Sequence, residues 1–350
     1  MMQSNLAKRY SMDDIEFELI QQDQCLPLVI KPIDSSVDIV KWGESNKVRI
    51  KELLTEYGGI LFRGFKVSSS DVFEDFIESV SSSVLSYTER SSPRSAVSGN
   101  IYTSTDHPED KEIFLHSEQS YNLQFPMRIF FYCEKAARSG GATPIADARK
   151  IFQRIDPQLR SQFKENAYRY SRCFWPMMGI NWQTAFQTSD KQSVEKYLQE
   201  NQINFEWGSL GELKTYQTRP LVAEHPDSGE KCWFNHCTFF NVSTLDTQTQ
   251  EMLLSSFAQD ELPNNTYYSD GTPIEPEVMD ALREAYLSEK VEFEWQQGDV
   301  LMLDNMLVTH GRGTFEGDRS VLVGMSEVCS WEAVKSENID CKSLRDREKC

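Results

Sequence analysis

Short apolar segments with strand character occur on both sides of a central region of this chain, and mainly helical signals lie in that region. Apolar runs of this length, bounded by turn residues, are typical of strands covered on both faces. The segments are residues 60–62, 127–133, 291–295, 300–303 and 320–326. Strands on both sides of a helical region predict a mainly β fold, a double-sheet barrel or jelly roll with inserted helices.

Helical periodicity is clearest in two early segments. Apolar residues recur at helical spacing over residues 45–57, and Gly58-Gly59 would end that helix. Ser70 or Asp71 can cap a second helix, whose apolar stripe is Phe73, Phe76, Ile77 and Val80. Two short helices are expected over residues 147–166, the second starting near Pro157, and another over residues 276–288.

No internal repeat, low-complexity tract or Pro/Gly-rich linker divides the sequence. We therefore expect one domain over residues 26–334, with a helical and loop insert at about 148–290. Residues 1–25 are expected to form a poorly constrained arm, and residues 335–350 a charged tail.

The charge of the chain limits its partners. With 36 Lys+Arg against 54 Asp+Glu, the formal net charge is −18, which disfavours nucleic acids and anionic membranes as partners. No stretch approaches the ~18 uninterrupted apolar residues of a membrane helix. The eight cysteines are scattered without a Cys-x-x-Cys pair, which favours reduced thiols and a cytoplasmic location.

The pattern His116-Ser117-Glu118 carries the clearest chemical signal. In an extended segment, residues two positions apart point to the same face, so both side chains could reach one metal ion. His310 follows a predicted strand far along the chain. Two imidazoles and one carboxylate on one side of a metal are the ligand set of non-haem Fe(II) oxygenases. A His-x-Glu pair also occurs in strands that bind no metal, so the spacing alone leaves both interpretations open.

Two further residues fit a carboxylate-binding site near such a metal. Arg319 stands at the start of the apolar strand that follows His310, and its planar guanidinium suits two-pronged binding of a carboxylate. Thr143 follows the turn at Gly140-Gly141, and its hydroxyl could donate to the same carboxylate.

Eight short stretches together resemble the taurine dioxygenase (TauD/TfdA) superfamily of Fe(II)/2-oxoglutarate dioxygenases, in particular its SyrP-like hydroxylases. They are GGILFRGF (58–65), YTSTDHP (102–108), LHSEQSY (115–121), GGATPIAD (140–147), GEKCWFNH (229–236), YSDGTPI (268–274), FEWQQGDVLMLDN (293–305) and HGRGTFEGDRSVLVGM (310–325). Each stretch is short, but their order and spacing are specific.

The resemblance implies a double-stranded β-helix, a jelly-roll variant, and a role for each motif residue. His116, Glu118 and His310 would bind Fe(II). Arg319, helped by Thr143, would bind the distal carboxylate of the co-substrate 2-oxoglutarate. The implied reaction uses O₂ to convert 2-oxoglutarate into succinate and CO₂ while a C–H bond of a small-molecule substrate is oxidised.

The carboxylate ligand narrows the expected reaction. Taurine dioxygenase itself has Asp where this chain has Glu118, and several relatives that hydroxylate amino acids have Glu. Halogenase relatives have a small residue there, so Glu118 favours hydroxylation, desaturation or cyclisation over chlorination. We expect hydroxylation of an amino acid or amino-acid-derived group, free or bound to a carrier protein, in a biosynthetic pathway.

Other residues are candidates for substrate binding, and each has a structural alternative. Arg312 could bind an anion or order the turn after its strand. Asn235 could meet substrate or be satisfied by nearby backbone. Thr103 could line the pocket or be an ordinary strand residue. Arg90 and Arg94 could hold a carboxylate or the phosphopantetheine arm of a carrier, or be solvated surface charges.

The same residues are compatible with other functions and metal sites. A zinc-dependent hydrolase could use His116, Glu118 and His310 but would not need Arg319 and Thr143. A non-catalytic binding protein could keep the fold without the reaction. The set His225, Cys232, His236 and Cys237 fits no common zinc spacing. His107, beside Pro108, reads as a loop residue.

Overall fold

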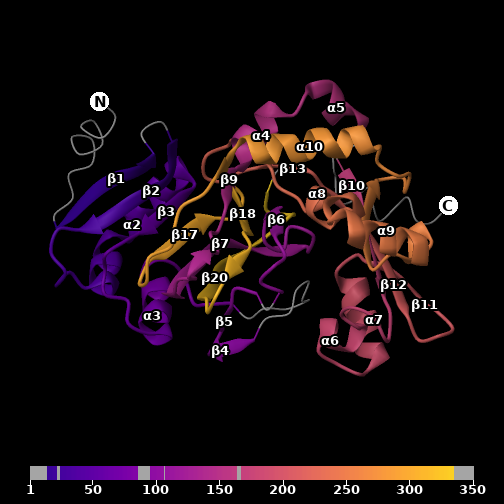
Figure 1. The fold of residues 1–350 in the computed structure, drawn as a ribbon, viewed down its shortest axis with the longest axis horizontal. Coiled ribbons are helices and arrows are strands. Elements are labelled where there is room, and N and C mark those ends of the chain that lie inside the picture. The colour runs from indigo at the N-terminus through magenta and orange to yellow at the C-terminus, as the bar shows by residue number, and fades with distance from the viewer. Residues whose placement is uncertain (1–13, 22–23, 86–94, 106, 164–166, 335–350) are drawn as a thin grey trace.

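The computed structural model describes residues 14–21, 24–85, 95–105, 107–163 and 167–334. Its centre consists of an eight-stranded sheet and a four-stranded sheet that pack against each other (Figure 1). The large sheet runs in the order β1 (Ile15–Gln21), β2 (Gln24–Pro32), β3 (Gly59–Phe62), β17 (Val300–Asp304), β7 (Gln124–Lys135), β20 (Ser320–Ser330), β5 (Ile101–Thr103) and β4 (Ala96–Ser98). The small sheet runs in the order β16 (Lys290–Val291), β9 (Ile145–Asp147), β18 (Val308–Arg312) and β6 (Ile113–His116). The predicted jelly roll is confirmed.

The pleat of β7 explains why both faces of its middle part, residues 129–133, are apolar. Successive side chains of a strand point to opposite faces of the sheet. Phe131 packs into the core between the two sheets, together with Leu301 of β17 and Val308 of β18. Phe130 and Tyr132 face the other way and join the core beneath the N-terminal helices. The expectation that the strand at 127–133 is covered on both faces is confirmed.

Two helices, α2 (Ile39–Tyr57) and α3 (Ser70–Val80), cover the outer face of the large sheet. Asp38 caps α2 by accepting from the backbone N–H of Val40 and Lys41, and Gly58 ends it with φ 78°. The helix therefore ends where the sequence predicted but starts earlier than residue 45. The predicted apolar stripe of α3 is buried.

The insert between β9 and β16 contains more sheet than the sequence predicted. Its helices are α4 (Ala148–Arg154), α5 (Pro157–Gln162), α6 (Trp182–Phe186), α7 (Lys191–Glu200), α8 (Cys237–Phe240), α9 (Thr247–Ser256) and α10 (Pro276–Ser288). Its own four-stranded sheet has the order β11 (Asn204–Trp207), β12 (Leu213–Pro220), β10 (Ala167–Phe174) and β15 (Asn264–Tyr268). The short strands β13 (Val222–Glu224) and β14 (Lys231–Trp233) form a separate pair. The expected helical and loop insert is therefore a mixed unit that forms its own side of the molecule (Figure 1).

Two expectations about strands are wrong. Ile15–Gln21 is not part of a loose arm, because it pairs with β2 and buries Ile15, Phe17 and Leu19. These apolar residues alternate with polar ones, the period of a half-buried strand. The predicted strand at 291–295 is limited to Lys290–Val291, because Phe293 and Trp295 are buried in the core without a strand ladder. Residues 1–13 and the predicted tail, 335–350, lie outside the described residues.

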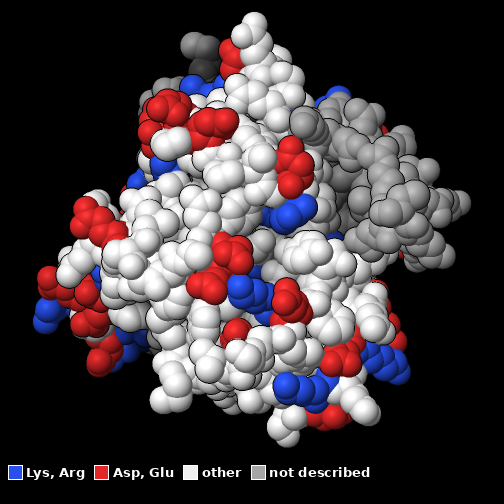
Figure 2. Space-filling view, turned by 90° about the vertical axis from the view of Figure 1, so that its right-hand side faces the viewer, with Lys and Arg blue, Asp and Glu red and all other residues white. Residues whose placement is uncertain are grey.

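One face of the molecule carries interspersed charges. On the face shown in Figure 2, Lys and Arg stand among Asp and Glu, with no continuous basic area over the described atoms. This face therefore lacks the basic stripe that proteins use to bind a nucleic-acid backbone. Within the described part of the chain, no helix combines the length and apolar character needed to cross a membrane.

Candidate metal centre

Two histidines that lie far apart in the sequence face each other across neighbouring strands. His116 is the last residue of β6, and His310 lies in the middle of β18. The two strands pair antiparallel with His310 directly opposite His116, and the ring centroids are 4.5 Å apart. Strand register therefore brings the two imidazoles together.

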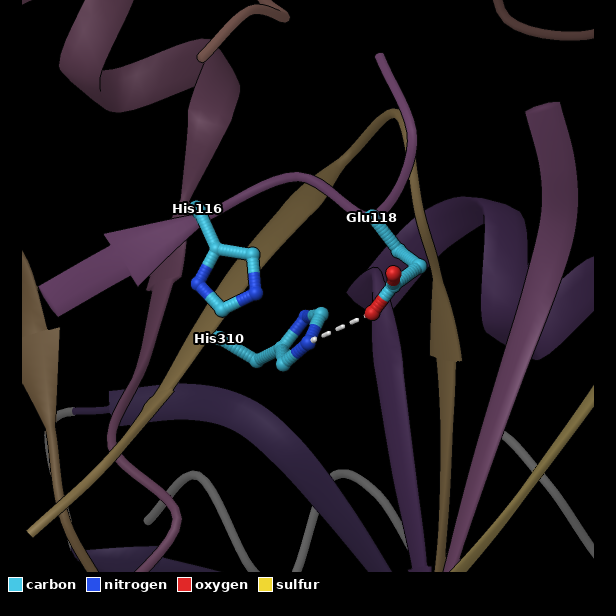
Figure 3. Close-up of side chains that lie close together, drawn as sticks. All are labelled: His116, Glu118 and His310. Carbon is cyan, nitrogen blue, oxygen red and sulfur yellow. Dashed lines mark ion pairs between the residues drawn. The ribbon is translucent and has the colours of Figure 1, made fainter. Parts of the chain in front are cut away.

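Glu118 completes the group from the turn that follows β6 (Figure 3). Its Oε2 lies 3.7 Å from Nε2 of His310, and one ligand atom from each of the three residues lies within 4.8 Å of the others. The expectation of an extended His-Ser-Glu segment is wrong, because the strand ends at His116. The turn nevertheless brings the carboxylate to the same point.

The surroundings of the three side chains suit a divalent metal such as Fe(II). All three are buried, and two neutral imidazoles with one carboxylate form the ligand set of a facial triad. Nδ1 of His116 lies 2.9 Å from the Phe114 carbonyl oxygen, which leaves Nε2 for a metal. Nδ1 of His310 is buried without a hydrogen-bond partner among the described residues, and the His310 ring packs on Phe131 at 5.1 Å. Packing therefore orients the second imidazole.

Arg319 lies beside residues that extend the strand ladder carrying His310. Its Nε donates to the Gly141 carbonyl at 3.0 Å, and the guanidinium has no carboxylate partner among the described residues. Gly141 has φ +73°, and a Cβ there would lie 3.0 Å from the arginine side chain, so glycine lets Arg319 approach. Burial, followed by the nearby charge of Arg312, lowers the pKa of Arg319 to about 10. An unpaired, partly buried cation of this kind is suited to an anionic ligand.

Thr143 lies two residues beyond Gly141 and is buried. Its hydroxyl oxygen accepts from Nε1 of Trp295 at 3.1 Å, so its own hydrogen remains available to donate. The backbone around it pairs with the chain after His310, since Gly313 N donates to the Ala142 carbonyl. One ladder thus carries His310, Thr143 and the carbonyl that holds Arg319.

The three candidate substrate residues make structural contacts. The Arg312 guanidinium donates to the backbone carbonyls of His107, Pro108 and Lys111, so it orders the loop before β6. Asn235 is satisfied by backbone: its amide donates to the Leu221 carbonyl and accepts from Cys237 N. Thr103 accepts from Ser95 N in the β4–β5 hairpin. Arg90 and Arg94 lie outside the described residues.

The histidines and cysteines of the weighed zinc set do not converge. The triad is the only cluster of metal-ligating side chains that the described ranges bring together. His225 instead lies 3.1 Å from the buried carboxylate of Asp304. His107 is an exposed loop residue, as expected.

Sequence reasoning missed two residues beside the triad. His236, at the start of α8, forms a hydrogen bond between its Nδ1 and Oγ of Ser120 at 2.7 Å. Its ring centroid lies 5.4 Å from that of His116. Burial holds the pKa of His236 well below its ordinary value. Asn305 hydrogen-bonds the backbone of Glu118. The sequence signal for Asn305 was the turn-like Asp-Asn pair after a predicted strand, and that for His236 was its place inside a motif.

Sequence comparisons place most of the chain in one family. Residues 26–326 match the family described as Taurine catabolism dioxygenase TauD, TfdA family. The dapdiamide synthesis protein DdaC of Enterobacter agglomerans is 39% identical over 276 residues, which cover 79% of this chain and 84% of that protein. A clavaminate synthase-like protein of Arabidopsis thaliana is 28% identical over 317 residues, covering 85% and 93%.

Solved structures share the fold. PvcB of Pseudomonas aeruginosa aligns with a TM-score of 0.54 at 14% identity, over 94% of this chain and 96% of PvcB. AAD-2 in complex with Mn(II) and N-oxalylglycine aligns with a TM-score of 0.53 at 12% identity, over 89% of this chain and 96% of AAD-2. The resemblance in sequence motifs is confirmed: the chain belongs to the TauD/TfdA family and is an Fe(II)- and 2-oxoglutarate-dependent dioxygenase.

Proposed function

We propose that this dioxygenase hydroxylates an unactivated C–H bond of an amino acid or amino-acid-derived substrate, free or carrier-bound, in a biosynthetic pathway. In this proposal His116, Glu118 and His310 hold Fe(II), and Arg319 with Thr143 binds the distal carboxylate of 2-oxoglutarate. The supporting observation is the convergence of the three side chains within 4.8 Å. Because the chain belongs to a dioxygenase family, it is neither the zinc hydrolase nor the non-catalytic binding protein considered as alternatives.

Each protein group has a defined task in this reaction. His116, Glu118 and His310 would hold the metal through two imidazoles and one carboxylate, the ligand set of a facial triad. Bound Fe(II) would supply the oxidising chemistry, in which 2-oxoglutarate, O₂ and substrate give succinate, CO₂ and the hydroxylated product. Arg319 orients the co-substrate through a charge-assisted hydrogen bond, which is strong where water is scarce. Phe131 and Phe239, whose rings lie against His310 and His116, limit access of water to the ligands.

The substrate class is inferred from the carboxylate ligand and from a relative. Glu118 provides the third ligand, so the proposed triad leaves no chloride site in its place. DdaC is named as a dapdiamide synthesis protein, which supports a biosynthetic role here. A cytoplasmic location is part of the proposal, because the six described cysteines are free thiols and fit a reducing compartment.

Substrate-stimulated formation of succinate tests the substrate class. Purified enzyme would be incubated with Fe(II), ascorbate, 2-oxoglutarate and panels of free and carrier-loaded amino acids, and both products followed by mass spectrometry. We expect one amino-acid class to raise succinate formation and to gain one oxygen atom. Loss of two hydrogens instead would show desaturation or cyclisation. Without stimulation by any panel member, the amino-acid proposal would fail while the dioxygenase assignment stands.

Arg319→Ala should weaken binding of 2-oxoglutarate. Removing one partner of a buried, hydrogen-bonded charge pair costs about 2–5 kcal/mol, which corresponds to a loss in affinity of roughly 30-fold or more. The measurement is an anaerobic titration of the Fe(II)-loaded enzyme with 2-oxoglutarate, followed by the visible charge-transfer band. The apparent KM for 2-oxoglutarate should rise in parallel.

Arg138→Ala is the matched control, because Arg138 is exposed and pairs with Glu316 near the same turn. It should titrate like the wild type. Equal affinity for 2-oxoglutarate in the Arg319→Ala enzyme would contradict the assigned role of this arginine.

A further inference from the structure

We propose that Asn305 is the positioning residue of the metal centre and that its side-chain amide fixes Glu118 in the geometry that binds the metal. The inference rests on the proposed role of Glu118 as a ligand. In this proposal Asn305 does not contact the three atoms that bind the metal. It acts through the backbone of Glu118.

The amide of Asn305 bonds both polar groups of the Glu118 backbone. Oδ1 accepts from Glu118 N at 2.8 Å, and Nδ2 donates to the Glu118 carbonyl at 2.9 Å. The second hydrogen of Nδ2 goes to the Pro126 carbonyl at 2.8 Å. The side chain thus uses one acceptor and two donors, a set that only an amide provides at this length.

The turn that carries Glu118 needs such support. Strand β6 ends at His116, so Glu118 lies in a turn outside the strand. Glu118 and Asn305 are both buried. A backbone N–H or C=O group left there without a hydrogen bond would cost its full desolvation free energy. The next residue, Gln119, has φ 54°, a left-handed conformation that is unfavourable for a residue other than glycine. Asn305 provides hydrogen-bond partners for both backbone groups of Glu118 in this turn.

Asn305 is in turn held by the large sheet. Its backbone N–H donates to the Met127 carbonyl of β7 at 3.0 Å. The preceding residue, Asp304, accepts from Met306 N and Leu307 N and so shapes the turn that leads into β18. One Asp-Asn turn therefore sets the direction of the strand carrying His310 and the position of Glu118. This explains how ligands from two distant segments keep a common geometry.

Metal binding in the absence of substrate tests the inference. Metal-free enzyme would be titrated anaerobically with Mn(II), and free Mn(II) followed by electron paramagnetic resonance. Partners behind metal ligands typically account for about 10–100-fold in metal affinity, so we expect a loss in this range for Asn305→Asp and Asn305→Ala. Asn305→Asp keeps the size of the side chain but removes both donors.

Asn241→Ala is the matched control. Asn241 is also buried and also bonds backbone, donating to the Thr266 carbonyl and accepting from Ser243 N, but it supports no proposed ligand. It should bind Mn(II) like the wild type. Hydrogen exchange gives a second measurement: in Asn305→Asp the peptide containing residues 117–122 should exchange faster while the β7 peptide stays protected.

The outcomes separate the two proposals. If the wild type does not bind Mn(II), the proposed metal site fails. If the wild type binds and the Asn305 variants bind equally well, only the role of Asn305 is overturned. Global unfolding of both variants, seen by circular dichroism, would also overturn it, because Asn305 would then be a residue of general stability.

Discussion

The His310→Ala enzyme is expected to lose Fe(II) binding and, with it, all substrate-dependent formation of succinate. The substitution removes one of three proposed ligands, so the loss in metal affinity should exceed the about 10–100-fold typical of a partner behind a ligand. Anaerobic addition of Fe(II) and 2-oxoglutarate should give a visible charge-transfer band with the wild type and none with the variant. His116→Ala should behave in the same way, because His116 stands directly opposite His310 in the strand register.

His107→Ala is the matched control for loss of an imidazole. Its side chain lies on an exposed loop, and the hydrogen bond from Arg312 goes to its backbone carbonyl. This variant should keep the band and the activity. If the His310→Ala enzyme folds and still binds Fe(II) with wild-type affinity, the proposed metal centre is wrong.

The Asp304→Asn enzyme is expected to be strongly destabilised. Asp304 is completely buried and forms an ion pair with Arg128, which is 2% exposed. Asparagine can still accept from Met306 N and Leu307 N, so the substitution removes mainly the charge. Leaving a buried charge unpaired costs about 3–5 kcal/mol. The lower end is expected, because Glu327 remains 3.5 Å from Nε of Arg128. The midpoint of urea unfolding measures the loss.

The same pair predicts a pH dependence. Burial alone would raise the pKa of Asp304, but Arg128 and then His225 outweigh it and hold the pKa below its ordinary value of 3.8. A lowered pKa in the folded state stabilises the protein above the unfolded-state pKa, and this contribution disappears as the pH falls through the folded-state value. The difference in free energy of unfolding between wild type and Asp304→Asn should therefore be largest near neutral pH and should shrink in strong acid.

Asp318→Asn is the control, because Asp318 pairs with Lys135 on the exposed surface. Exposed pairs contribute little, so the unfolding midpoint should stay where it is in the wild type. If Asp304→Asn unfolds at the same urea concentration as this control, the buried pair does not contribute the expected stability.

Much of the local structure could be predicted from residue patterns. Helical spacing and Gly58 predicted where α2 ends, and the stripe Phe73, Phe76, Ile77 and Val80 predicted the buried face of α3. Pro157 marked the start of α5. These features depend on interactions within a few residues of one another, so the sequence of each segment is sufficient.

Predictions failed where distant contacts decide the structure. The strand expected at 291–295 is short because Phe293 and Trp295 are buried in the core rather than paired in a sheet. The sheet of the insert was missed because its strands β10, β12 and β15 pair across intervening helices and loops. Asn305 offered only a turn signal, although its partner Glu118 is 187 residues away.

By itself, the sequence determined the chemical types of the proposed ligands, the motif order that identifies the family, and most of the helices. Only the tertiary structure decided that β18 pairs with β6 in the register that opposes His310 and His116, and that a turn rather than a strand presents Glu118. The physical reason is the separation along the chain between the residues that interact. Helix periods and caps are encoded within one or two turns of chain, whereas strand register and buried hydrogen bonds depend on which distant segments exclude water together.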